Sequence, residues 1–246
     1  MIYDSIALML PTYGRSSTYL PRFIDTAIQH WDNQSPISFG FCVNAADRAT
    51  VEYIMRREWP EGIDYWVITE SLPKPNLATY FNMLYEELKR RGDKGAVASM
   101  VGDDMIFETH GWNVRLLALI NQYKGTGVFW CNDLFIARER CPVNLFVTQD
   151  FIEATEHPFM CEEFEGEMID WLWGKVGKYT RTSHYDPDIH IRHDHDGSKP
   201  DKDATTLRLL PSKNQGHAIG KGRARQVAIE IAEILKAKGL TGESVC

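Results

Sequence analysis

Two adjacent carboxylates, Asp103 and Asp104, come shortly after an apolar run at residues 97–101. A run of this length, preceded by a glycine-containing turn, indicates a strand buried on both faces. In open α/β sheets, ligands bind at the carboxyl ends of the strands. Adjacent carboxylates repel each other, and a hard divalent cation such as Mg²⁺ or Mn²⁺ relieves that repulsion. The pair therefore predicts a cation site, and a solvated Asp-Asp turn is the alternative.

A polar loop follows the first apolar run of the chain. Residues 6–10 predict a buried strand, which ends at Pro11 and Thr12, and Arg15 precedes a segment with helical spacing over 20–28. A loop between the end of a strand and the start of a helix is a common place to bind an anion. An ordinary strand-to-helix turn is the alternative.

The second half of the chain contains candidate proton acceptors. Asp170 lies in an expected helix over residues 167–173, and a positioned carboxylate can accept a proton during catalysis. Glu162, Glu163 and Glu167 are rival bases close by in the sequence. A solvent-facing position on the helix is the structural alternative for Asp170.

Two histidines, His193 and His195, lie in an alternating segment over residues 188–196. The alternation predicts a strand that runs into a polar loop, and alternate residues of a strand share a face. We expect only one of the two imidazoles to bind a metal. Ordinary strand-end histidines are the alternative.

Strand and helix patterns alternate through the first 135 residues. Expected strands cover 6–10, 37–43, 65–68, 97–101 and 127–131, and expected helices cover 20–28, 51–55, 77–88 and 111–120. This order predicts an α/β fold with a mainly parallel sheet and helices on both faces.

The remaining residues change in character. We expect an edge strand over 145–148, a loop over 196–222 rich in Gly, Pro, Ser, Lys and Asp, and a closing helix over about 223–238. The predicted division of a single domain is 1–135, 136–195, 196–222 and 223–246.

The totals narrow the class of protein. The 246 residues carry a net charge of −7, which argues weakly against a protein that coats nucleic acid. No apolar stretch is long enough for a transmembrane helix, and the first residues do not read as a signal peptide. The five cysteines are widely spaced, which favours free thiols in a reducing, cytoplasmic setting.

The order of these motifs resembles the GT-A class of nucleotide-sugar glycosyltransferases, within the broad family-two-like group of inverting enzymes. The resemblance covers nearly the whole chain and rests on four places: Pro-Thr-Tyr-Gly-Arg at 11–15, Asp47, Val-Gly-Asp-Asp-Met-Ile-Phe at 101–107, and Asp170 ahead of His-Asp-His at 193–195. It implies a GT-A fold, a Rossmann-like sheet with a smaller acceptor-side part. It also implies a nucleotide-sugar donor and an Mn²⁺ or Mg²⁺ cofactor.

The resemblance also implies roles for individual residues. Those on the donor side are Pro11, Thr12 and Arg15 around the nucleotide, Asp47 at the base edge, Asn82 facing the donor, and Asp103 at the ribose or a metal-bound water. Asp104 and His193 would bind the cation, and Asp170 would be the catalytic base. Gly102 stands where the family usually has the first carboxylate of its D-x-D element, so the division of labour between Asp103 and Asp104 stays open.

Sugar transfer has chemical requirements that suit this set. A divalent cation stabilises the leaving diphosphate, and a carboxylate takes the proton of the acceptor hydroxyl. Lys199 and Lys202, in the expected loop, could close over the phosphates and exclude water. Solvated loop charges are the alternative for both lysines.

The acceptor is the least determined part. Small stand-alone proteins similar to this chain occur among phages, where some glycosylate hydroxymethylated bases in DNA, and such a phage enzyme would act in the host cytoplasm. A basic run supports contact with phosphates: Lys213, His217, Lys221, Arg223 and Arg225. A glycan or a small-molecule hydroxyl is the alternative acceptor.

Two other functions are compatible with the sequence. The spacing of His193 and His195 is reminiscent of dinuclear zinc hydrolases, although His217 is the only later histidine and two zinc ions need more nitrogen ligands. A nucleotide-binding protein without turnover is the other alternative, because fold does not fix function.

Overall fold

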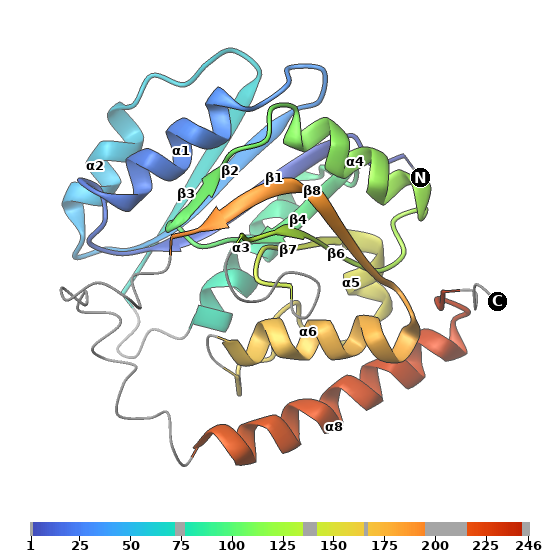
Figure 1. The fold of residues 1–246 in the computed structure, drawn as a ribbon. Helices are drawn as coiled ribbons and strands as arrows, with labels where there is room; N and C mark the ends of the chain where they lie inside the picture. Colours follow the sequence, from blue (N-terminus) through green and yellow to red (C-terminus); the bar gives the residue numbers. More distant parts are fainter. Residues whose placement is uncertain (1, 72–76, 135–141, 165–166, 195–215, 243–246) are drawn as a thin grey trace.

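The computed structural model describes residues 2–71, 77–134, 142–164, 167–194 and 216–242 (Figure 1). The first half contains β1 (Ser5–Thr12), α1 (Tyr19–Gln29), β2 (Ile37–Asn44), α2 (Arg48–Arg56), β3 (Ile63–Glu70), α3 (Leu77–Arg91), β4 (Ala96–Met100), β5 (Met105–Phe107), α4 (Trp112–Gln122) and β6 (Val128–Asn132). The second half contains β7 (Leu145–Thr148), α5 (Gln149–Ala154), α6 (Glu167–Thr180), β8 (Ser183–His193) and α8 (Gly216–Ala237). The predicted α/β class is confirmed.

The strands form a mixed sheet in the order β3-β2-β1-β4-β7-β6-β8-β5. Parallel pairing joins β1 to β2 and β4, β2 to β3, and β6 to β8. β7 runs antiparallel to both β4 and β6, so β4 and β6 point the same way. The carboxyl ends of β1, β4, β6 and β8 therefore lie at one edge of the sheet, where open α/β sheets bind ligands.

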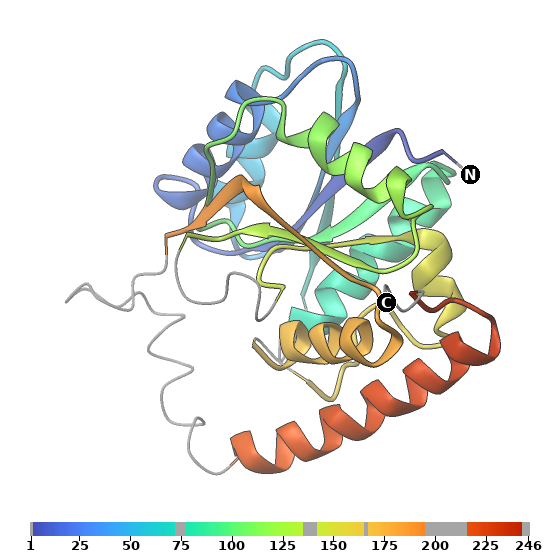
Figure 2. The same ribbon diagram turned by 45° about the vertical axis from the view of Figure 1, so that its right-hand side comes forward.

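Helices cover both faces of the sheet, as predicted. Along β1, Ile6, Leu8 and Leu10 pack with residues of α1, α2 and α4, whereas Ala7 and Met9 pack with residues of α3, α5, α6 and α8. Every one of these side chains is inaccessible to solvent, which explains why this strand is a continuous apolar run. α8 packs along α6 on the side away from the sheet (Figures 1 and 2).

One strand lies where the sequence did not place it, and another was not predicted at all. The expected edge strand over 145–148 is β7, which is fully buried between β4 and β6. β5, directly after the two aspartates, does not pair with β4 but runs antiparallel to β8 at the far edge. Apolar patterns report burial but not the neighbouring strand, which explains both differences.

The closing helix begins earlier than predicted. α8 starts at Gly216, not at about residue 223, so the expected loop over 196–222 is shorter. Its first residues, Gly-His-Ala-Ile-Gly-Lys-Gly, contain three glycines, each costing a helix about 1 kcal/mol relative to alanine, and this predicted a loop. Helix propagates more readily than it nucleates, so the packed turns that follow extend it. His195, Lys199, Lys202 and Lys213 lie outside the described residues. Within the described ranges, no helix is both long and apolar enough to cross a bilayer.

Candidate active site

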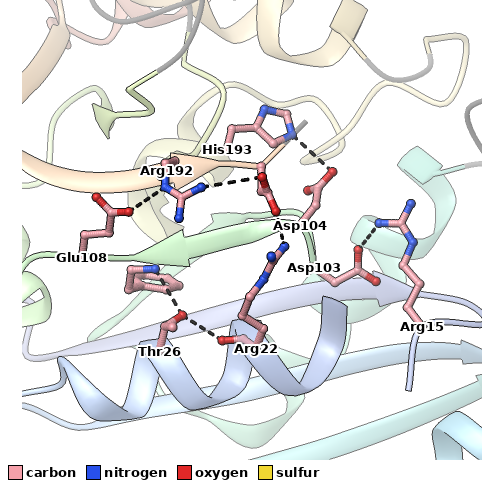
Figure 3. A network of polar contacts seen from close by, with 10 residues as sticks. Arg15, Arg22, Thr26, Asp103, Asp104, Glu108, Arg192 and His193 are labelled. Carbon is pink, nitrogen blue, oxygen red and sulfur yellow. Dashed lines mark hydrogen bonds and ion pairs between the residues drawn. The ribbon is translucent and has the colours of Figure 1, made fainter. Parts of the chain in front are cut away.

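The two aspartates lie in the turn between β4 and β5. The backbone N–H of Met105 donates to the carbonyl of Gly102 over 3.2 Å and closes this turn. Asp103 is 5% exposed and faces the end of β1. Thr12 Oγ1 donates to Asp103 Oδ2 over 2.6 Å. The Arg15 guanidinium forms an ion pair with the same carboxylate (Figure 3). The structure therefore brings Thr12, Arg15 and Asp103 together.

Asp104 meets His193 from the other side of the same turn. Its Oδ2 lies 3.4 Å from His193 Nε2, and the two side chains are 19% and 21% exposed (Figure 3). The pairing of β5 with β8 places Met105 opposite His193, which brings the preceding aspartate close to the imidazole. The His193 N–H donates to the carbonyl of Asp133 over 3.0 Å, and the Asp194 N–H donates to that of Asp104 over 2.9 Å.

The two aspartates have different electrostatic surroundings. Burial raises the pKa of Asp103 above its ordinary value, although Arg15 and Thr12 favour its charged form. Burial also acts to raise the pKa of Asp104, but the hydrogen bond and charge of His193 outweigh it and the pKa is lowered. Burial acts to lower the pKa of His193, but Asp104 together with Asp133 and Asp194 outweighs it, and the pKa is raised. Burial therefore dominates at Asp103, whereas the nearby positive groups dominate at Asp104.

Gly102 gives the Asp104 carboxylate its space. A Cβ built on Gly102 would overlap with Asp104 Oδ1. The sequence showed a missing first carboxylate of a D-x-D element at this position, and the structure gives a physical reason for the glycine. Any larger side chain would displace the Asp104 carboxylate.

Asp47 joins two loops at the same edge of the sheet. Its Oδ2 accepts from the Gly14 N–H over 2.5 Å, and its Oδ1 accepts from the Thr50 N–H over 3.2 Å and so caps α2. Pro11 is half-buried near the end of β1. Tyr13, which sequence reasoning did not single out, lies beside them and is 60% exposed.

Asn82 makes structural contacts on α3. Its Nδ2 donates to the carbonyl of Met160 over 2.8 Å, and its Oδ1 accepts from the Met160 N–H over 2.8 Å. Nδ2 also contacts Glu162 Oε1 at 3.4 Å. The side chain thus fixes the segment that leads toward α6, and its predicted contact with a donor stays a prediction.

Asp170, the predicted base, lies half-buried on α6. Of its rivals, Glu162 and Glu163 are exposed, and Glu163 forms an ion pair with Arg223 of α8 over 3.2 Å. Glu167 begins α6. The catalytic role of Asp170 stays a prediction.

A chain of ion pairs that sequence reasoning missed lies beside the aspartates (Figure 3). Asp194 Oδ2 lies 2.6 Å from Arg22 on α1, and its Oδ1 lies 3.6 Å from Arg192. Arg192 in turn lies 2.6 Å from Glu108 Oε1. We call Arg22, Asp194, Arg192 and Glu108 the Asp194 network. Its members come from segments far apart in the sequence, so no local pattern identifies them.

The comparisons with known proteins bear on the fold. No family model matches the sequence, and no curated protein matches it. The structure is similar to that of the mannosyltransferase PcManGT from Pyrobaculum calidifontis in complex with GDP-Man and Mn²⁺. The TM-score is 0.56 at 12% sequence identity, and the match covers 97% of this chain and 76% of that one. The chain has a glycosyltransferase-like fold.

Proposed function

We propose that this protein is a metal-dependent glycosyltransferase of the GT-A class, and that it inverts the anomeric centre. It transfers a hexosyl or pentosyl group from a nucleotide-diphosphate donor to an acceptor hydroxyl. The observation that carries the proposal is the Asp104–His193 pair at the carboxyl edge of the sheet. The fold is shared with a mannosyltransferase whose structure contains GDP-Man and Mn²⁺, which supports the same reading.

The residues at this pair suit Mn²⁺ or Mg²⁺. A carboxylate oxygen and an imidazole nitrogen are ligands that these ions accept. Among the described residues, no group of three or more His, Cys, Asp or Glu side chains could hold a metal. Mg²⁺ usually binds through one or two carboxylates together with substrate phosphates, so the donor diphosphate would complete the coordination. The cation would stabilise the negative charge that develops on the leaving diphosphate.

The donor nucleotide would bind along the ends of β1 and β2. Asp103, held by Thr12 and Arg15, would contact the ribose. Pro11 and Asp47 would line the base pocket, with Asn82 and Lys199 as further donor contacts. In this proposal residues 1–135 form the donor half and 136–195 the acceptor half.

Asp170 would act as the base. The acceptor oxygen forms its bond to the anomeric carbon as the bond from that carbon to the phosphate oxygen breaks. The proton of the acceptor hydroxyl passes to the Asp170 carboxylate. Glu162, Glu163 and Glu167 are the alternative acceptors of that proton.

The acceptor in this proposal is the hydroxyl of a hydroxymethylated base in DNA, as in the small phage enzymes that the sequence resembles. Lys221, Arg223 and Arg225 are exposed on α8 and could contact phosphates. The modified base would have to leave the stack to reach the site. Transfer should weaken steeply with salt, because phosphate contacts release counterions. A glycan acceptor, tested in parallel, should show no such dependence.

The test is incubation with a panel of nucleotide sugars and Mn²⁺, with and without a chelator. Release of a nucleoside diphosphate that depends on both metal and acceptor supports a transferase. Cleavage of simple phosphate or carboxyl esters without a nucleotide sugar would indicate a metal hydrolase. Binding of the nucleotide without turnover against a broad acceptor panel would indicate a nucleotide-binding protein.

A further inference from the structure

The Asp194 network joins α1 and the end of β8 to the turn that holds Asp104. Arg22 projects from α1 to Asp194, which directly follows His193 at the end of β8. The backbone N–H of Asp194 donates to the carbonyl of Asp104 over 2.9 Å. The residue that Arg22 contacts is therefore bonded to one member of the Asp104–His193 pair and covalently joined to the other.

The part of α1 that presents Arg22 is itself fixed to β5. Thr26 Oγ1 donates to the Arg22 carbonyl over 2.9 Å and accepts from the Phe107 N–H over 3.2 Å (Figure 3). Because β5 pairs with β8, α1 and the two strands form one connected unit. The guanidinium carbon of Arg22 also lies over the Tyr19 ring, 5.3 Å from the ring centroid. The guanidinium carbon of Arg15, the partner of Asp103, lies over the same ring at 4.9 Å from the centroid.

We infer that Arg22 is a positioning residue which, through Asp194, holds the Asp104–His193 pair in its metal-binding arrangement. The inference rests on the proposed function, because it takes that pair as the metal site. Arg22 is not a ligand in this view. It holds the side chain of Asp194, whose backbone N–H is hydrogen-bonded to the Asp104 carbonyl.

The charge of Arg22 and its positioning role predict opposite effects on metal affinity when the guanidinium is removed. If only charge mattered, removal of a guanidinium near the site would favour a bound cation, because a repulsive charge is lost. If position matters, removal would weaken metal binding, because outer-shell partners that orient metal ligands typically contribute about 10- to 100-fold to metal affinity. Substitution of Arg22 by a neutral residue therefore separates the two effects.

The ion pair is only partly accessible. The Arg22 and Asp194 side chains are 38% and 22% exposed, but the pairing nitrogen Nη2 of Arg22 is buried, so the melting temperature of each variant is measured beside its Mn²⁺ binding. The same helix offers a matched control, since Asp25 on α1 pairs with Arg57 over 2.6 Å. Arg57→Gln breaks that ion pair without touching the candidate site.

The experiment measures free Mn²⁺ by electron paramagnetic resonance, with the full-length protein titrated alone and with GDP, UDP, ADP, CDP and TDP in turn. The variants are Arg22→Gln, Arg22→Lys, Asp194→Asn, the Arg22→Gln/Asp194→Asn double variant and the control Arg57→Gln. We expect Arg22→Gln and Asp194→Asn each to weaken Mn²⁺ binding by about 10- to 100-fold. Arg22→Lys should lose less Mn²⁺ affinity than Arg22→Gln. The double variant should lose no more Mn²⁺ affinity than either single variant, because the two residues act as one unit. The melting temperature of each variant should be close to that of the Arg57→Gln control.

The outcomes separate this inference from the proposed function. If the wild-type protein binds no Mn²⁺ under any of these conditions, the proposed metal dependence fails and the inference fails with it. If the wild-type protein binds Mn²⁺ and Arg22→Gln binds it as tightly or more tightly, only the positioning role is overturned. An equal loss in Arg57→Gln would also overturn it, because the effect would then belong to α1 as a whole.

Discussion

Thr12 Oγ1 donates a 2.6 Å hydrogen bond to Asp103 Oδ2, and Arg15 pairs with the other oxygen of the same carboxylate. The protein itself therefore engages both oxygens of Asp103. Asp104, by contrast, faces His193 at 3.4 Å. The two adjacent aspartates, which the sequence could not distinguish, thus have different partners in the structure.

The first prediction follows from that division. Asp104→Asn should abolish Mn²⁺-dependent binding of a nucleoside diphosphate. Asp103→Asn should keep the dependence on Mn²⁺ but destabilise the fold by about 1–3 kcal/mol, because the partly buried Arg15 loses its charged partner. Calorimetry with and without a chelator measures the first effect, and urea unfolding the second. Equal loss of metal dependence in both variants would assign the metal to the pair of aspartates.

Gly102→Ala is predicted to act on the candidate metal site alone. The new Cβ would overlap with Asp104 Oδ1 and push the carboxylate away from His193. We expect Mn²⁺ affinity to fall about 10-fold, which is the scale on which ligand orientation acts. Gly222→Ala on α8 is the control, because a Cβ there meets no atom within 4 Å. Unchanged Mn²⁺ titrations for Gly102→Ala would show that Asp104 does not need this space.

Asp170→Asn should reduce sugar transfer by about 100- to 10,000-fold, the usual contribution of a positioned general base. Donor binding should stay near the wild-type value, because the substitution keeps the size of the side chain. The measurement compares turnover and nucleotide affinity for the same variant. Wild-type turnover would move the role to Glu162, Glu163 or Glu167, each of which is then replaced by Gln.

Asn82→Ala is predicted to destabilise the fold. The substitution removes both hydrogen bonds to the backbone of Met160 and the contact with Glu162. At about 0.5–1.5 kcal/mol for each of the two backbone bonds, urea unfolding should show a loss of about 1–3 kcal/mol. A large loss of nucleotide affinity with unchanged stability would instead support the predicted contact with the donor.

The buried thiols predict how stability depends on pH. Burial raises the pKa of Cys42 to about 12 and that of Cys161 to about 11. The pKa of a thiol in an unfolded chain is about 8.5. Above that value the unfolded chain releases protons first, so the stability that these thiols contribute is present below about pH 8.5 and is lost as pH rises toward 11. Each thiol should contribute a slope of up to about 1.4 kcal/mol per pH unit.

Unfolding in urea at closely spaced values between pH 8 and pH 11 measures this slope. Cys42→Ala should reduce it, and the difference between the two proteins isolates this thiol from other groups that titrate in the same range. The same slope with and without Cys42 would contradict a raised pKa for its thiol.

The sequence alone was enough for the features that depend on local pattern. The apolar runs of β1 and β4 show that both strands are buried on both faces, because every side chain of such a strand meets a helix or another core residue. Thr12 lies at the end of the first run, and Asp103 and Asp104 follow the end of the second. Since parallel strands end at the same edge of a sheet, the sequence was sufficient to predict that both loops lie at that edge, but not that they are neighbours there.

Only the tertiary structure decided which strands are neighbours. β7 is buried in the sheet and β5 crosses to the far edge, because a short apolar run is compatible with several partners and the packing of the whole sheet selects one. That choice sets Asp104 against His193 and Arg22 against Asp194. Such contacts join residues from distant parts of the chain, so the physical reason for them is the pairing of β5 with β8, which no local pattern contains.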